Sequence, residues 1–134
     1  MSINRYILLL TIISTPAWAG KQIDYGAIQE RCIQSANSSE NGFMQTAILI
    51  ECAESTSKEV KKEINSLYKN LYNDLSIKSL ADAAKLEQSQ KSWVIYRNQQ
   101  CELATDYVGT PMSAVCPMDL NILRVKELRQ LSGQ

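Results

Sequence analysis

The chain has 134 residues, with 14 Lys and Arg against 14 Asp and Glu, no histidine and four cysteines. A net charge of zero without a long basic run provides no attraction to the phosphates of DNA or RNA, which excludes nucleic acid as a partner. Without histidine the chain holds neither a Ser-His-Asp nor a Cys-His catalytic arrangement, and it lacks the commonest general base and metal ligand.

The first 19 residues have the pattern of a secretory signal peptide. An apolar stretch follows Arg5, and a small-x-small cleavage site ends at Ala19. The stretch is too short to cross the about 30 Å hydrocarbon core of a membrane, and no later segment is long and apolar enough to do so. We therefore predict a signal peptide over residues 1–19, cut after Ala19, and a single domain over residues 20–134 that is periplasmic or secreted.

Export places the thiols in an oxidising compartment, where an even number of cysteines indicates disulfides. The absence of C-x-x-C spacing and of histidine argues against a thioredoxin-like redox site and against a zinc site. We expect two structural disulfides, but the sequence leaves all three pairings open. The nearest-neighbour pairing would staple one helix pair in each half of the chain, at roughly 3 kcal/mol per bridge. The cysteines are Cys32, Cys52, Cys101 and Cys116.

The first predicted helix of the mature chain ends at about Ala36. Asp24 is a suitable N-cap, and a polar run after Ala36 stops the helix. Tyr25, Ile28 and Cys32 share one face of this helix, because they are spaced three and four residues apart.

Two further helical segments are predicted over residues 43–53 and 56–75. Thr56 and Glu59 have the spacing of a capping box, which favours a helix start at Thr56. If the segments formed one straight helix, Cys52 would fall well outside the apolar stripe, so we expect a kink or break near Thr56. The stripe follows the i, i+3, i+4, i+7 rule and consists of Val60, Ile64, Leu67, Tyr68, Leu71 and Leu75.

The second half of the chain predicts two more helices joined by a loop. Ser79 and Asp82 mark the start of a long helix that continues to about Tyr107. A loop covers residues 108–115, and the last helix begins at Pro117, because proline suits a first turn. Strand signals are weak, so the predicted fold is all-α, a small antiparallel bundle of four to five helices stapled by two disulfides.

Charged residues interrupt the apolar stripes of these two helices. An unpaired buried charge is costly, so we expect Arg97 and Glu127 to face each other as a polar clamp that fixes helix register. Gln90, Tyr68 and Asn65 are candidates to complete its hydrogen bonds, and an electrostatic functional site is the alternative interpretation. The stripes contain Leu86, Gln90, Trp93, Val94, Arg97 and Cys101 in the long helix and Leu120, Leu123, Leu128 and Leu131 in the last.

Two surfaces are candidates for contact with a partner protein. The last helix has a second apolar face, Met118, Ile122 and Val125, which is either a partner surface or one side of a helix sandwiched between two others. The loop carries Tyr107 and Met112 as candidate anchors, and a loop tied off by a disulfide loses little entropy on binding. An irregular connection without function is the alternative for the loop.

Catalysis has little support in the sequence. No spacing singles out a carboxylate pair for glycosidase-like chemistry, and the charged run over residues 54–63 is typical of a solvated helix face. The chain also has no Gly-rich phosphate loop and no axial histidine. We therefore predict a protein that is not an enzyme and that binds no cofactor and no metal.

Three short patterns follow one another along the chain. Together they resemble the LprI-type lysozyme inhibitor family, a group of small exported bacterial domains, over about residues 32–131. The resemblance implies an exported helical domain that blocks a cell-wall lytic enzyme, such as a lysozyme, by direct contact. The alternative is an envelope adaptor or immunity-like protein with a different protein partner. The patterns are Ile64-Asn65-x-x-Tyr68-x-x-Leu71, then Gln90-x-x-Trp93-Val94-x-Tyr96-Arg97-Asn98-x-x-Cys101, then Cys116-x3-Leu120-x3-Arg124-x-x-Glu127-Leu128.

Overall fold

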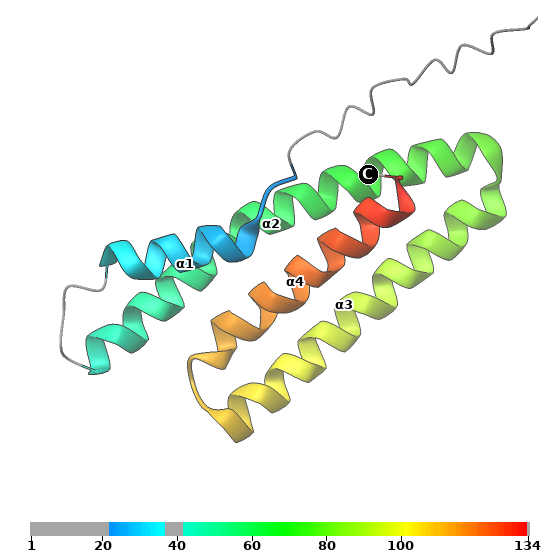
Figure 1. Ribbon diagram of the computed structural model, residues 1–134. Coiled ribbons are helices and arrows are strands. Elements are labelled where there is room, and N and C mark those ends of the chain that lie inside the picture. The colour runs from blue at the N-terminus through cyan, green and yellow to red at the C-terminus, as the bar shows by residue number, and fades with distance from the viewer. Residues whose placement is uncertain (1–21, 37–41, 134) are drawn as a thin grey trace, which may run out of the picture.

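The computed structural model describes residues 22–36 and 42–133, and within these ranges it is entirely helical. The helices α2, α3 and α4 pack against one another, and α1 lies along α2 (Figure 1). The all-α prediction and the two predicted disulfides are confirmed, whereas the predicted signal peptide lies outside the described residues. The elements are α1 (Tyr25–Ala36), α2 (Gly42–Lys78), α3 (Leu80–Val108) and α4 (Met112–Leu131).

Helix α1 begins and ends where the sequence predicts. The carboxylate of Asp24 accepts a hydrogen bond from the backbone N–H of Ala27 at 3.0 Å, which caps the first turn. Tyr25 is buried and Ile28 packs against the same core cluster, while Cys32 is bonded to α2. One face of α1 therefore attaches the helix to the bundle.

Helix α2 is continuous through Thr56, so the predicted break is wrong. The hydroxyl of Thr56 donates to Gln29 of α1 at 3.1 Å, and the hydroxyl of Ser57 accepts from Asn121 of α4 at 2.9 Å. Both side chains are buried and bond between helices instead of capping a new one. Cys52 is bonded to α1, while the stripe packs in the larger apolar cluster with side chains of α1, α3 and α4. All six predicted stripe residues are buried or partly buried against the core.

The connections around α3 differ in how well the sequence predicts them. Ser79 caps α3, and its hydroxyl accepts from the backbone N–H of Asp82 at 3.3 Å. The loop after α3 is shorter than predicted, because Met112 already begins α4 and Pro117 lies inside that helix. Gly109 makes the short turn with a φ of 125°, a conformation that L side chains rarely adopt.

The buried side of α4 is only partly the predicted one: of the predicted stripe, Leu128 is fully buried and Leu120 partly buried, while the other two leucines are exposed. Leu123 and Leu131 are 52% and 65% exposed, whereas Met118 and Val125 are 4% and 1% exposed. Ile122 also packs against the core. The hypothesis that Met118, Ile122 and Val125 form an outer partner surface is therefore wrong, because α4 is sandwiched in the bundle and this face packs inward.

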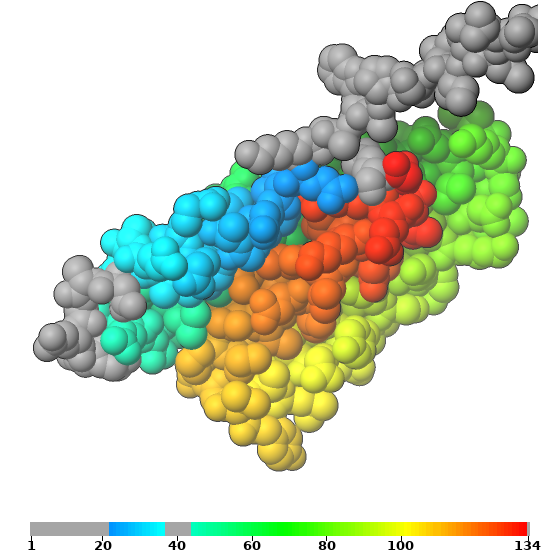
Figure 2. All heavy atoms as spheres, in the orientation of Figure 1, coloured from blue at the N-terminus to red at the C-terminus, as the bar shows by residue number. Residues whose placement is uncertain are grey.

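Apolar side chains form two clusters of different size. The smaller cluster joins α2 to the start of α4, and in Figure 2 the packed atoms of α4 (orange to red) lie between those of α1 and α3. The buried members of the larger cluster are Tyr25, Val60, Ile64, Leu67, Leu71, Leu86, Val125 and Leu128. The buried members of the smaller cluster are Ala53, Ala114 and Met118, with Ile50, Val115 and Ile122 packed against them.

Candidate functional site

Both disulfides join the nearest cysteines along the chain. Cys32 and Cys52 link α1 to α2 with their Cα atoms 5.7 Å apart. Cys101 and Cys116 link α3 to α4 with their Cα atoms 5.4 Å apart. The structure thus selects one of the three pairings that the sequence leaves open, and each bridge staples one pair of helices.

The predicted polar clamp exists with different partners. Glu127 accepts a hydrogen bond from Arg124 Nη1 at 2.8 Å, and Arg124 Nε donates to Gln90 at 3.0 Å. Arg97 instead donates from Nη1 to the amide oxygen of Asn121 at 3.0 Å. The predicted pairing of Arg97 with Glu127 is therefore wrong, while Gln90 does belong to the cluster.

Trp93 lies beside both arginines of this cluster. The guanidinium carbons of Arg97 and Arg124 lie 5.1 and 5.6 Å from the centre of the Trp93 ring, within the range of a cation–π contact. Arg97 is otherwise held by the neutral amides of Asn98 and Asn121, and burial lowers its pKa. The cluster joins α3 to α4 through a charged residue that is nearly enclosed, Arg124.

Two of the other predicted clamp residues lie elsewhere. Tyr68 packs beside Tyr72, with ring centroids 6.0 Å apart, and Asn65 is exposed. The predicted clamp leaves out Arg124, although this residue lies inside the predicted apolar stripe of α4 and is buried. Arg124 lies four residues after Leu120 and four before Leu128, a spacing that places all three near one side of a helix.

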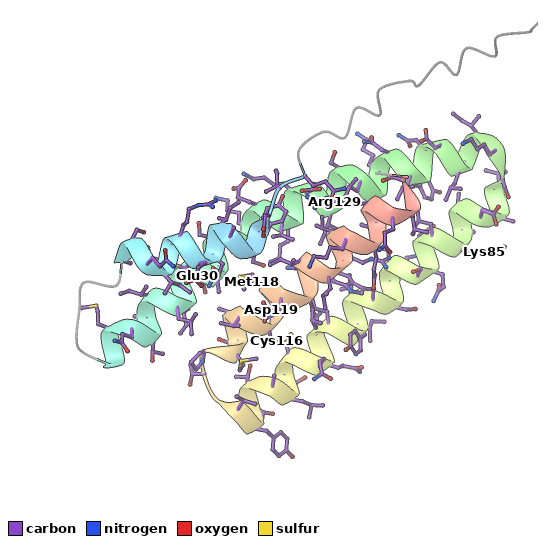
Figure 3. The ribbon with its side chains drawn as sticks, in the orientation of Figure 1. Glu30, Lys85, Cys116, Met118, Asp119 and Arg129 are labelled. Carbon is purple, nitrogen blue, oxygen red and sulfur yellow. A yellow bond between two sulfur atoms is a disulfide. The ribbon has the colours of Figure 1, made fainter. Side chains whose placement is uncertain are left out.

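A second polar cluster, which the sequence analysis did not find, holds the start of α1. Arg129 binds both carboxylate oxygens of Glu63 at 2.7 and 2.9 Å and donates to the carbonyl of Ile23 at 3.2 Å. The hydroxyl of Tyr25 donates to the same carboxylate at 2.6 Å. A hollow of about 580 Å³ lies beside this cluster, between residues 22–26 and α4, and Figure 3 labels Arg129 near the end of α4.

The ionisation of this second cluster follows from its contacts. Burial alone would raise the pKa of Glu63, but hydrogen bonds from Arg129 and Tyr25 outweigh it and hold the pKa below the ordinary 4.5. Burial, followed by the hydrogen bond to Glu63, raises the pKa of Tyr25. Because the guanidinium of Arg129 is engaged by Glu63 and Ile23, the cluster is a structural lock between α1, α2 and α4.

The α3–α4 tip, which we define as residues 101–116, is the most exposed part of the predicted contact surface. The Cys101–Cys116 disulfide closes it, and the backbone N–H of Gly109 donates to the carbonyl of Thr105 at 3.1 Å. Tyr107 is 86% exposed, and Met112 is partly buried. The tip therefore presents a large aromatic side chain on a cross-linked turn.

Neither metal binding nor membrane insertion finds support in the part of the chain that the structure describes. Across residues 22–36 and 42–133, no three His, Cys, Asp or Glu side chains gather as metal ligands. None of the helices in these ranges has the length and apolar composition needed to cross a membrane.

These contacts define a class of protein, a small helical domain cross-linked by two disulfides. The chain belongs to the lysozyme inhibitor LprI family, whose sequence model matches residues 32–128. The matched segment contains both disulfides and the Trp93 cluster, whereas Tyr25 and Arg129 fall outside it. No match to the chain is found among curated proteins or among solved structures.

Family membership has three consequences. It indicates a role like that of a lysozyme inhibitor, in a family of inhibitors and not of enzymes. It also indicates a lysozyme as the kind of partner. Together with the disulfides, it indicates a location outside the cytoplasm.

Proposed function

We propose that the protein is exported, with its signal peptide cut after Ala19, and that it inhibits a cell-wall lytic enzyme of the lysozyme type. In this proposal the α3–α4 tip enters the cleft of the enzyme and blocks access of its substrate. Membership of the inhibitor family supports the activity. The inhibitor itself performs no chemistry and uses no cofactor.

The exposure of Tyr107 is the observation that carries the choice of the tip. A tyrosine that is 86% exposed contributes little to packing within its own chain. Tyrosine is also enriched among the residues that dominate binding energy at protein interfaces. The nearby disulfide limits the freedom of the turn, so ordering the tip in a complex costs little entropy.

The contact surface extends from the tip along one side of α3. Tyr96, Leu103 and Tyr107 follow the i, i+7, i+11 spacing, which places them within a narrow stripe of the helix. All three are more than half exposed. This exposed α3 stripe gives the proposed contact a length of three helical turns, and Met112 adds a partly buried apolar group at its end.

An enzyme assay tests the proposal directly. The oxidised mature protein is titrated into turbidity assays of several lysozyme types, and we expect inhibition of at least one of them. Tyr107→Ala should weaken the inhibition about tenfold, equivalent to about 1.4 kcal/mol of binding energy.

Ile77→Ala provides the matched control, because Ile77 is also 86% exposed and lies at the opposite turn, between α2 and α3. This variant should inhibit like the wild type. If the oxidised wild-type protein inhibits no lysozyme, the function is wrong. If Tyr107→Ala inhibits as well as the wild type does, the function stands and the tip is the wrong surface.

The alternative function, an envelope adaptor or immunity-like protein, relied on an outer apolar face of the last helix. Since Met118 and Val125 are buried, that face is not available without rearrangement of the bundle.

A further inference from the structure

The charges of the chain are distributed unevenly along the bundle. Between residues 98 and 123 the chain has three acidic residues and no Lys or Arg, although its total charge is zero. This segment comprises the second half of α3, the tip and the first half of α4. The acidic residues are Glu102, Asp106 and Asp119.

The opposite end of the bundle has the reverse balance. Between residues 61 and 91, six lysines accompany four acidic residues. Figure 3 shows this separation, since Asp119 lies toward the α3–α4 end and Lys85 lies near the turn between α2 and α3. Near neutrality of the whole chain therefore conceals an acidic end and a basic end.

The acidic residues of α3 flank the exposed α3 stripe. Glu102 directly precedes Leu103 and Asp106 directly precedes Tyr107, so each carboxylate lies about 100° around the helix from its apolar neighbour. Both carboxylates are exposed. Within residues 22–36 and 42–133, neither of them forms an ion pair with a basic side chain.

Asp119 of α4 also lacks a basic partner among the described residues. Partial burial raises the pKa of this carboxyl, and no neighbouring cation offsets the effect. Within residues 98–123, the segment that contains most of the exposed stripe, no lysine or arginine therefore accompanies these carboxylates.

We propose that the exposed α3 stripe docks on a basic protein surface, with Glu102 and Asp106 facing lysine or arginine side chains of the partner. The stripe supplies apolar contact, while the two carboxylates select the partner by charge and accelerate association. This inference rests on the proposed function and adds the chemistry of the partner surface.

Binding measurements at three ionic strengths test the inference. The oxidised mature protein is titrated with a basic animal-type lysozyme at low, physiological and high salt by calorimetry. We expect Glu102→Gln/Asp106→Asn to weaken binding at least fivefold at low salt. The difference from the wild type should disappear at high salt, where the Debye length is only a few ångströms.

Two controls separate local charge from total charge. Glu59→Gln/Asp74→Asn removes the same charge from exposed positions of α2 and should bind like the wild type. The same lysozyme with acetylated lysine amines has lost positive charge and should bind more weakly than untreated lysozyme. If Glu102→Gln/Asp106→Asn and acetylation of the lysozyme both leave the affinity unchanged while inhibition persists, the charge inference is overturned and the proposed function stands.

The charge inference can also be tested if the proposed function fails. If no lysozyme binds, the proposed function fails, and the protein is then titrated with a tetralysine peptide while its amide signals are followed by NMR. Shifts concentrated at residues 102–107 would support a basic partner other than lysozyme. If the peptide causes no shifts at these residues, the inference is overturned as well.

Discussion

The two ends of the bundle are held together by different interactions. Around the turn between α2 and α3, large aliphatic side chains such as Leu67, Leu71 and Leu86 fill the core. Toward the α3–α4 tip the buried cluster is small and contains two alanines, and both disulfides lie at this end. Covalent links thus accompany a small buried cluster at the tip, whereas both ends expose large apolar side chains, Tyr107 at the tip and Ile77 at the other turn.

This difference explains how the tip can be held in place with few large side chains in its core. Burial stabilises a helix pair in proportion to the apolar area removed from water, and that requires the large side chains to face inward. A disulfide instead stabilises mainly by limiting the unfolded chain. The tip can therefore direct Tyr107 outward without depending on that side chain for stability.

The largest expected effect concerns the aliphatic end. Leu128→Ala removes a fully buried side chain from the larger cluster and should lower the free energy of unfolding by roughly 3–5 kcal/mol, because it leaves a cavity. Leu131→Ala, in the same helix but on its exposed side, is the matched control and should have little effect. Urea denaturation of the two variants measures the difference, and equal losses would contradict the assigned buried side of α4.

Removing each disulfide tests the difference between the two ends of the bundle. Cys101→Ser/Cys116→Ser and Cys32→Ser/Cys52→Ser should each lower the free energy of unfolding by about 3 kcal/mol, from the entropy of loops of this length. Only the first pair closes the tip, so only its loss should also weaken the proposed inhibition at a temperature where both variants are folded. Thermal denaturation and the turbidity assay measure the two effects, and equal inhibition by both variants would show that the tip needs no cross-link.

The lock on α1 predicts a dependence on pH. Arg129→Ala leaves the largely buried carboxylate of Glu63 without its cation, and it should cost somewhat less than the about 3–5 kcal/mol of a fully buried pair. Because the pKa of Glu63 is lower in the folded state, its contribution is present above the unfolded pKa, near 4.5, and is lost as the pH falls through the lowered folded value. The difference in stability between wild type and Glu63→Gln should therefore shrink below pH 4.5, as measured by denaturation at a series of pH values.

The two arginines beside Trp93 should differ in how much they stabilise the fold. Arg124→Ala removes a nearly enclosed guanidinium that binds Glu127 and Gln90, so we expect a loss of about 2–3 kcal/mol. Arg97→Ala removes bonds to neutral amides and should cost about 1–2 kcal/mol. Melting temperatures measure the order of the two, and an unchanged value for Arg97→Ala would exclude any structural role for that residue.

Much of the fold follows from local patterns. Asp24 and Ser79 act as caps where the sequence places them, and the stripe that begins at Val60 faces the core. The capping box at Thr56 misled the prediction, because a hydroxyl that can cap a helix can equally bond to a neighbouring helix, as it does to Gln29.

The candidate site was only partly predictable. The position of Tyr107 beside a cross-linked turn predicts that it is exposed, as it is, while its contact with a partner stays a prediction. The predicted clamp pair is wrong because the sequence does not set the register between α3 and α4: Arg97 lies opposite Asn121, and Glu127 bonds to Arg124 of its own helix. Arg129 was missed because its partner Glu63 lies 66 residues away in the sequence.

The sequence by itself determined the helical class, the two cross-links and the family, because caps, periodicity and cysteine content are properties of local segments. Only the tertiary structure decided which cysteines pair and which side of α4 is buried. Apolar residues occur on several sides of α4, so its own sequence does not select one, and packing against α2 and α3 makes the choice. The same packing brings the second half of α3 and the first half of α4, whose charged residues over 98–123 are all acidic, to one end of a chain of zero net charge.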